Sequence, residues 1–488
     1  MKKFLIVNIL FATLLFSCDD WLDVNTDPNN PTEINPDLIL PVAQHYSARI
    51  MQEDRGINHL GNMMMVNWSE SGGFSWYNDE FLYLANSTFY NEIFDYTYHD
   101  ALKQYADLDD LGDEYSAYKA ISMIMKSFHF QILVDLYGDI PYAEALQRSD
   151  NPTPAYTAAT VVYDDLLVQL TNAIELMDAA EADPLSIVPE GDDVMFGGDL
   201  MMWKQFANTI KLRILNRVSG VKDAAFITAE LAAIAAEGSG YISSDVEINP
   251  GYANQTDQQS PFWTSFGQSV NGDNTLTNNA TCASEHILTV LTDLSDPRIG
   301  RLYEEPATGH LGVPQGVTVD PNDFGQEQVS NIGPGILVGP TQGAKIMTMA
   351  EMNFNLAELA LNNFATGDAA TLYNAGVTAS FVSLGLTAAD ATTYLAQTVE
   401  NVSYADSSDK LEAIITQKWL AMNGITAEQS WFDWVRTGFP LDLPISQEQP
   451  NLVRPVRLAY PASEVAGNSN NLPSQLPDPF TEKIFWAN

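Results

Sequence analysis

The sequence predicts a mostly α-helical protein with long irregular loops. Apolar residues recur at three- and four-residue steps over long stretches, which is the spacing of a helix that buries one face. Two stretches lack this pattern: residues 238–281 combine Gly, Asn and Gln with aromatic residues, and residues 297–340 are rich in Gly and Pro. With 488 residues, 45% of them hydrophobic, the chain is long enough for one large core or two ordinary ones.

The N-terminus has the pattern of a signal peptide. Lys2 and Lys3 precede an apolar run, Phe4–Phe16, which is shorter than the roughly 20 residues of a membrane-spanning helix. The run ends in Leu15-Phe16-Ser17-Cys18, which resembles a bacterial lipobox. We therefore expect residues 1–17 to be removed and Cys18 to carry lipid as the first residue of the mature chain. No other apolar stretch reaches spanning length, so the mature protein is expected to be anchored to a membrane without crossing it.

The residues after Cys18 predict a tether. Asp19-Asp20 resembles the surface-export signal of Bacteroidetes lipoproteins, although a plain periplasmic lipoprotein or a signal remnant would also fit. Residues 23–41 are rich in Asn, Asp and Pro, which favour turns and extended chain. We therefore expect an extended tether over residues 18–41. The other cysteine, Cys282, has no CxxC partner and is expected to be a small buried residue.

Helices are predicted from residue 115 onward. Tyr115–Tyr137 has apolar residues at helical steps and ends at Gly138. Val161–Met177 repeats the pattern, with Thr160 placed to cap its N-terminus. Further helices are predicted over Leu200–Val218, Ala224–Glu237, Ile346–Asn363, Ala369–Leu384, Lys410–Asn423 and Glu428–Val435.

The charge balance excludes several classes of partner. Lys and Arg number 22 against 63 Asp and Glu, which gives a formal net charge of -41. A surface this acidic repels a nucleic-acid backbone and disfavours anionic polysaccharides. Nucleic acid is therefore not expected as a partner, and a polysaccharide ligand is expected to be neutral.

Motifs for catalysis or metal binding are missing from the sequence. It has no HExxH, and its six histidines are scattered without an i, i+4 pair. The stretch Gly267–Asn271 misses a nucleophile elbow at its last position, and Asp320–Gly325 places Phe324 where a calcium loop needs a ligand. With 63 acidic residues, carboxylate pairs for glycoside hydrolysis can be found anywhere and so discriminate little.

Two aromatic clusters are the candidate ligand site. The segments 68–79 and 260–273 place rings beside Ser, Asn, Asp and Gly without helical spacing. Aromatic faces suit the apolar faces of pyranose rings, and nearby amides and carboxylates can bind hydroxyl groups. The alternative is that the rings pin these loops to the core. The candidate stacking residues are Trp68, Trp76, Tyr77, Phe262 and Trp263, and their candidate hydrogen-bonding neighbours are Asn78, Asp79, Gln259, Asn271 and Asp273.

Several ordered segments resemble the SusD/RagB-like lipoproteins, in particular the second SusD-like subfamily. Val435 departs from the pattern, because the family often has an Arg at that position. The segments that carry the resemblance are the lipobox, Asn25–Thr32, Leu136–Tyr142, Trp203–Arg213, Asp296-Pro297-Arg298, Ile346–Glu351, Gln417–Met422, Trp431, Arg436–Pro440 and Arg454–Glu464.

The resemblance implies a single domain over residues 42–488, built on a TPR-like scaffold of helical pairs with loop-rich insertions near 238–281 and 297–340. It implies a non-catalytic, lipid-anchored protein on the surface of the outer membrane. There it captures a glycan, for which we favour a neutral β-glucan, and delivers it to a SusC-like TonB-dependent transporter. Peptide cargo and glycoside hydrolysis are the alternatives. No cofactor is expected, and a structural calcium ion is left open.

The cationic and aromatic residues of these motifs are expected to organise the fold and not to bind the ligand. Arg436 and Arg457 are expected to pair with buried carboxylates and carbonyls. Trp419, Trp431 and Trp434 are expected in the core.

Overall fold

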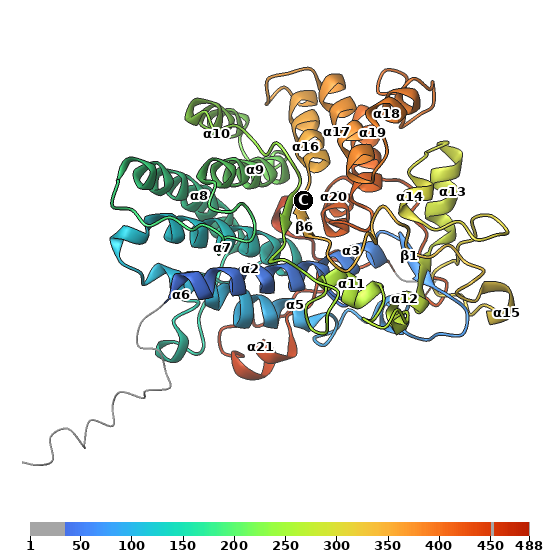
Figure 1. Cartoon of the computed structure of the whole chain (residues 1–488), viewed down its shortest axis with the longest axis horizontal. Coiled ribbons are helices and arrows are strands. Elements are labelled where there is room, and N and C mark those ends of the chain that lie inside the picture. The colour runs from blue at the N-terminus through green and yellow to red at the C-terminus, as the bar shows by residue number, and fades with distance from the viewer. Residues whose placement is uncertain (1–34, 450–452, 488) are drawn as a thin grey trace, which may run out of the picture.

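Helices that pack side by side form the body of the molecule. The computed structural model describes residues 35–449 and 453–487. Figure 1 shows α6–α9 on one side, α16–α19 above them, and the loop-rich segments around α11–α15 on the other side. The long helices are α2 (Pro36–Gln52), α7 (Ser116–Tyr137), α8 (Ala159–Ala182), α9 (Leu200–Val218), α10 (Ala224–Glu237), α16 (Met349–Leu361), α17 (Ala369–Ser383), α19 (Lys410–Met422) and α20 (Ala427–Thr437).

Short elements connect these helices and build the loop-rich side. The short α-helices are α3 (Ile57–Met64), α4 (Asn78–Phe81), α5 (Asn91–Tyr96), α6 (Lys103–Asp109), α11 (Pro261–Phe266), α12 (Leu276–Ala280), α13 (Glu285–Asp293), α14 (Ile299–Leu302), α15 (Pro321–Phe324), α18 (Ala388–Leu395) and α21 (Ala462–Gly467). The segment η1 (Thr97–Leu102) is a π-helix. The 3-10 turns are η2 (Asp113–Tyr115), η3 (Arg148–Asp150) and η4 (Phe485–Ala487).

The long helices stack on one another, mostly in chain order, as the prediction of a TPR-like scaffold requires. Helix α7 packs on α8, α8 on α9, α9 on α16, and α16 on α17. One large apolar cluster joins α2, α3, α7, α8 and α9 to α19 and α20, and a second lies among α16–α19. The mostly helical fold class is therefore confirmed, while the division into a single domain from residue 42 onward stays a prediction. No helix among the described residues is long and apolar enough to cross a membrane.

The predicted tether is too long at its C-terminal end. Helix α2 begins at Pro36, so residues 36–41 are helical. The side chain of Asn35 accepts a hydrogen bond from the backbone N–H of Asp37 (3.1 Å), and proline is well tolerated at the first helical position. Leu40 is fully buried, and this burial stabilises the helix despite Pro41. Residues 1–34, with the predicted signal peptide and Cys18, lie outside the described residues.

Two predicted helix starts are also wrong. Helix α8 begins at Ala159, so Thr160 lies inside its first turn, and the carboxylate of Asp139 accepts the hydrogen bond from Ala159 N (2.8 Å). Helix α16 begins at Met349, because residues 344–347 form a strand. Thr348 is its N-cap and accepts from Glu351 N (3.1 Å).

Three small antiparallel sheets join segments that are distant in the sequence. Strand β1 (Trp68–Glu70) pairs with β5 (Thr281–Ala283), with Trp68 opposite Ala283. Strand β2 (Ile140–Pro141) pairs with β3 (Tyr156–Thr157), and β4 (Val246–Ile248) pairs with β6 (Ala344–Met347) around a bulge. The first pair fixes the loop after β1 against the segment that follows α12. Cys282 lies in β5 and is fully buried, as predicted.

A network of buried charges holds the helices together. Arg213 on α9 pairs with Glu351 on α16 (2.6 Å). Asp433 on α20 lies 2.7 Å from Lys418, 3.2 Å from Arg217 and 3.1 Å from Arg436.

Four motif residues, one of them in this network, have the structural roles that were predicted. Arg436 also pairs with Glu358, and Arg457 donates to the carbonyl of Tyr137. Trp419 and Trp431 are buried, so the motif residues organise the core as predicted.

Candidate functional site

Three of the five predicted stacking residues are buried in an aromatic cluster around His59. Trp68, Tyr77 and Phe262 are at most 2% exposed. The ring of His59 lies 5.1 Å from that of Tyr77 and 5.6 Å from that of Phe266, and Trp68 lies 5.0 Å from Phe266. A ligand cannot reach rings that are covered on both faces. The prediction that Trp68, Tyr77 and Phe262 stack on a ligand is therefore corrected: these rings pin the two loops to the core.

The cluster fixes the loop that follows β1. Glu70 accepts hydrogen bonds from the backbone N–H of Tyr77 (3.0 Å) and of Trp76. The hydroxyl groups of Tyr77 and Thr281 are hydrogen-bonded to each other. Burial raises the pKa of Glu70, and the two backbone donors oppose this shift. The loop is thus held from both ends before any ligand arrives.

The remaining predicted ring on this loop points outward. Trp76 is 47% exposed, although its neighbour Tyr77 is buried. Asn78 and Asp79 begin α4 directly after it and are also exposed. The indole of Trp76 is therefore available to a ligand, with two polar side chains beside it in the sequence.

Trp263 presents a half-buried ring from α11. A Cβ atom on Gly267 would lie 2.5 Å from Cδ2 of Trp263, so the indole rests directly on the glycine backbone. Phe262 and Phe266, on the same helix, reach into the buried cluster. Because Phe266 and Tyr77 both contact His59, one buried cluster anchors the segments that carry Trp263 and Trp76. We use the name aromatic surface for Trp76 and Trp263 together with the predicted polar residues Asn78, Asp79, Gln259, Asn271 and Asp273.

The other three predicted polar neighbours, Gln259, Asn271 and Asp273, lie in the segments on either side of α11, the helix that carries Trp263. Gln259 donates from Nε2 to the carbonyl of Gln268 (3.2 Å) and to Asn254 Oδ1 (2.8 Å). Asn271 and Asp273 are exposed in the turn, where Ser269 N donates to the Asp273 carbonyl (2.8 Å). The carboxylate of Asp273 and the amide of Asn271 are therefore free to bind sugar hydroxyls.

Gly267→Ala is expected to weaken ligand binding by moving the Trp263 ring. The added methyl group would overlap the indole, which must rotate away from its resting place. We expect the dissociation constant to rise about tenfold, the equivalent of roughly 1.4 kcal/mol. Titration calorimetry with a polysaccharide that the wild type binds measures this change. Gly339→Ala is the matched control, because a Cβ at Gly339 meets no neighbour. Equal affinity of Gly267→Ala and the wild type would show that the Trp263 ring does not contact the ligand.

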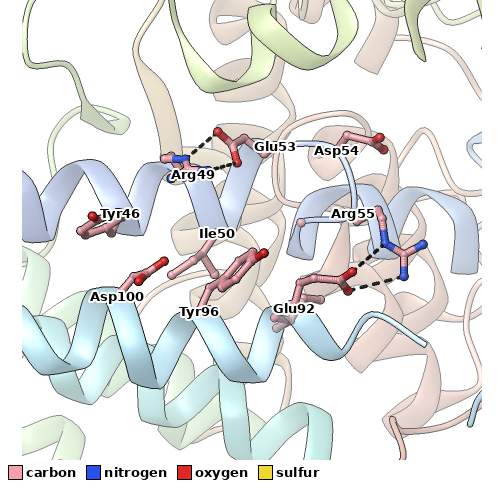
Figure 2. A pocket seen from close by; sticks show the side chains of 11 residues that line it. Tyr46, Arg49, Ile50, Glu53, Asp54, Arg55, Glu92, Tyr96 and Asp100 are labelled. Carbon is pink, nitrogen blue, oxygen red and sulfur yellow. Dashed lines mark hydrogen bonds and ion pairs between the residues drawn. The ribbon is translucent and has the colours of Figure 1, made fainter. Parts of the chain in front are cut away.

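A pocket beside the aromatic surface was missed by the sequence reasoning. It has a volume of about 280 Å³ and lies between α2 and the segment α5–η1. Figure 2 shows Tyr46 and Tyr96 within this groove, flanked by ion pairs that join Arg49 to Glu53 (2.7 Å) and Arg55 to Glu92 (3.4 Å). It also contains Asp54 and Asp100.

This pocket adjoins α11, because the backbone N–H of Asp54 donates to Ser265 Oγ (2.8 Å). Tyrosine rings beside charged groups are a combination that binds sugar rings and hydroxyls. The pocket escaped prediction because residues 36–41 read as tether and no helix was predicted over 91–109. The three- and four-residue spacing of Tyr46, Arg49, Ile50 and Glu53 was the available signal.

A second polar pocket lies where the two loop-rich stretches meet. Its volume is about 320 Å³, and amides and carboxylates dominate its lining. Its first lining residue, Asn274, directly follows Asp273, which was predicted to bind the ligand. Its polar lining residues are Asn274, Asn278, Asn279, Glu304, Glu305, Gln326, Glu327 and Asn331.

One acid among the described residues has a pKa that would suit catalysis, and it lies in the core. Burial raises the pKa of Glu428 to about 7, which suits a general acid, but this side chain is fully buried and has no access to a substrate. Within residues 35–449 and 453–487, no group of three or more His, Cys, Asp or Glu residues is placed to hold a metal ion. Binding by ring stacking and hydrogen bonds is the chemistry that the exposed groups support.

Comparison with known proteins gives a consistent family and fold. A family model named SusD-like and described as starch-binding, associating with outer membrane, matches residues 28–461. A chitin-binding SusD homologue from Flavobacterium johnsoniae is similar in structure, with a TM-score of 0.75 and 22% identity over 92% of this chain and 99% of that one.

SusD homologues from Bacteroides fragilis and Bacteroides uniformis are similar to the same degree. The first has a TM-score of 0.74 and 19% identity over 93% of this chain and 99% of its own. The second has a TM-score of 0.73 and 21% identity over 92% of this chain and 99% of its own. No curated protein sequence matches the chain.

Proposed function

The chain belongs to the SusD-like family of starch-binding, outer-membrane-associated proteins, and from this premise we propose that it captures a neutral polysaccharide without cleaving it. The observation that carries the proposal is the aromatic surface. One buried cluster anchors two segments, and each presents an accessible indole beside amides and carboxylates. A site of this kind binds the apolar faces of sugar rings with little loss of conformational entropy, because its side chains are already held in place.

A neutral ligand fits the electrostatics. The net charge of -41 opposes the approach of uronate or sulfated chains. We favour a β-glucan among the neutral polymers. Starch, named in the description of the family, and chitin, named for the Flavobacterium johnsoniae homologue, are also uncharged polysaccharides and belong in the same test.

The place of action proposed is the outer face of the outer membrane. Cys18 would carry the lipid, and residues 19–34 would tether the helical body. The SusD-like family associates with the outer membrane, which supports this placement. We propose that the protein hands its ligand to a SusC-like TonB-dependent transporter, and that binding requires no cofactor.

Affinity electrophoresis tests the proposal. The mature chain is run through gels that contain barley β-glucan, laminarin, soluble starch, glycol chitin or, as an anionic control, alginate. We expect at least one neutral polymer to retard the protein, alginate to leave its mobility unchanged, and EDTA to have no effect.

Three results would contradict the proposal. Unchanged mobility in every neutral polymer would show that the protein does not bind a neutral glycan. Steady release of reducing ends from a retarding polymer would indicate a glycoside hydrolase. Binding of a mixed peptide digest, with no polysaccharide bound, would indicate peptide cargo.

A further inference from the structure

A cavity on the helical side is separate in its chemistry from the aromatic surface. It has a volume of about 540 Å³ and lies among α5, η1, the loop over residues 145–154 and α21. Figure 1 shows α5 and α21 next to each other along one edge of the molecule, away from α12 and α15. Its walls are mainly apolar, with Phe94, Tyr96, Tyr98, Pro141, Leu146 and Pro152 among the lining residues. Small-molecule sites in proteins have this size and this kind of lining.

The backbone around this cavity is irregular on two sides. Tyr98 and His99 line it from η1, a π-helical turn, and such turns occur frequently at functional sites. In the loop that also lines the cavity, Leu146 and Arg148 adopt left-handed backbone conformations, with φ of 67° and 55°. Residues with a side chain rarely adopt this conformation, and they cluster at ligand sites when they do. Two unrelated segments thus depart from regular geometry at the same cavity.

One cation at the cavity is unpaired. Lys103 lines the cavity at the start of α6, and it is exposed. In the part of the chain that the structure describes, nearly every lysine makes an ion pair or hydrogen bond. Lys103 and Lys483 make neither. Although the chain has 63 acidic residues, no described carboxylate pairs with Lys103.

The other charged groups of the lining already have partners. Arg148 pairs with Asp107, and His99 Nδ1 lies 2.6 Å from Asp100. The two carboxylates of the lining accept hydrogen bonds: Asp95 from Ser463 and Asn91, and Glu464 from Tyr156 and Asn468. These four donors are neutral, so both carboxylates keep their negative charge, and a ligand anion would have to bind at Lys103, the lining cation that has no partner among the described residues.

We propose that this cavity binds a small amphipathic carboxylate, whose flat apolar group lies among the rings and prolines and whose carboxylate pairs with Lys103. We expect the neutral polysaccharide of the aromatic surface not to use this site, since its walls are mainly apolar and its two carboxylates already accept hydrogen bonds. Tyr96 also lines the pocket of Figure 2. The experiment therefore uses Lys103 and Ala145, which line this cavity but not that pocket.

Titration calorimetry of the mature chain with trans-cinnamate tests the proposal, with cinnamyl alcohol as the neutral isostere. We expect cinnamate to bind more tightly than the alcohol. Lys103→Gln should weaken cinnamate binding about tenfold, because a hydrogen bond to a charged group is lost, and should leave the alcohol unaffected. Ala145→Trp, which fills the cavity from a partly exposed position, should abolish binding of both.

The controls separate this proposal from the glycan function. Circular dichroism spectra of both variants should match the wild type, and both should be retarded by polysaccharide as the wild type is. The proposal is overturned if cinnamate shows no binding at millimolar concentration. It is also overturned if cinnamate binds equally to the wild type and to folded Lys103→Gln, or equally to the wild type and to folded Ala145→Trp.

Discussion

Replacing Asp433 by Ala is expected to lower the free energy of unfolding by about 3–5 kcal/mol, the usual cost of breaking a buried ion pair. The Asp433 carboxylate is 2% exposed and lies within 3.2 Å of Lys418, Arg217 and Arg436. Its removal would leave these three cations buried beside one another without this counter-charge. The loss would fall on the contacts among α9, α19 and α20, so the whole helical body should unfold at a lower urea concentration.

The Asp433 carboxylate also determines part of the change in folding stability at low pH. Burial alone would raise the pKa of Asp433, but Lys418, Arg217 and Arg436 together hold it below its usual range. A carboxyl group with a lowered pKa stabilises the folded state above its unfolded pKa of about 3.9. This stabilisation is lost as the pH falls below that value. The wild type should therefore lose stability below about pH 4, and Asp433→Ala should lose less over the same interval.

Asp164→Ala is the matched control for this stability measurement. Asp164 pairs with Lys222 at the surface, where its side chain is 52% exposed. Exposed pairs of this kind contribute about 0–1 kcal/mol. Urea titrations followed by circular dichroism should separate the two variants clearly. Equal midpoints for Asp433→Ala and Asp164→Ala would show that the buried network does not hold the helices together.

Helix boundaries were predictable where the signals are local in the sequence. Helices α9 and α10 begin and end at the predicted residues. Asp199 caps α9 by accepting from Met202 N (3.1 Å), and Gly238 ends α10 with a φ of 93°. Each signal lies within a few residues of the helix that it bounds, so the sequence is sufficient to find it.

The N-terminal part of the fold depends on partners that local sequence does not show. Residues 36–41 carry two prolines and a preceding Asn, a composition that favours turns. They form a helix because Leu40 is buried in a core to which distant helices contribute. The π-helical turn η1 and the pocket of Figure 2 also depend on this packing, and neither was predicted.

Contacts with residues distant in the sequence also decide which rings of the candidate site are buried and which are exposed. Trp76 and Tyr77 are neighbours in a segment of uniform composition, yet one is 47% and the other 1% exposed. Tyr77 is buried because Thr281 and His59, which are distant in the sequence, lie against it. Composition indicated the segments in which aromatic rings gather but could not show which rings face solvent.

Replacing both Trp76 and Trp263 by Ala is expected to weaken polysaccharide binding by at least about a hundredfold. Burying a large apolar side chain contributes about 1.5–3 kcal/mol, and each 1.4 kcal/mol corresponds to a factor of ten in affinity. The two indoles are the accessible rings that the buried cluster around His59 presents. Their removal leaves the hydrogen-bonding groups without apolar faces for the sugars. Trp76 is exposed and Trp263 half-buried, so the fold should tolerate both changes.

Phe226→Ala is the matched control for this pair of substitutions. Phe226 is a half-buried ring on α10, where Lys222 lies over it, and Figure 1 shows α10 far from α11. Its loss removes an aromatic ring of similar exposure without touching the aromatic surface. Phe226→Ala should bind polysaccharide as the wild type does.

Titration calorimetry with the polysaccharide that retards the wild type tests the central claim, that the two indoles form a glycan-binding surface. The wild type and Phe226→Ala should bind with equal affinity, and the double variant should show binding at least about a hundredfold weaker. Wild-type affinity in a folded Trp76→Ala/Trp263→Ala variant would contradict the claim and place the ligand elsewhere on the molecule.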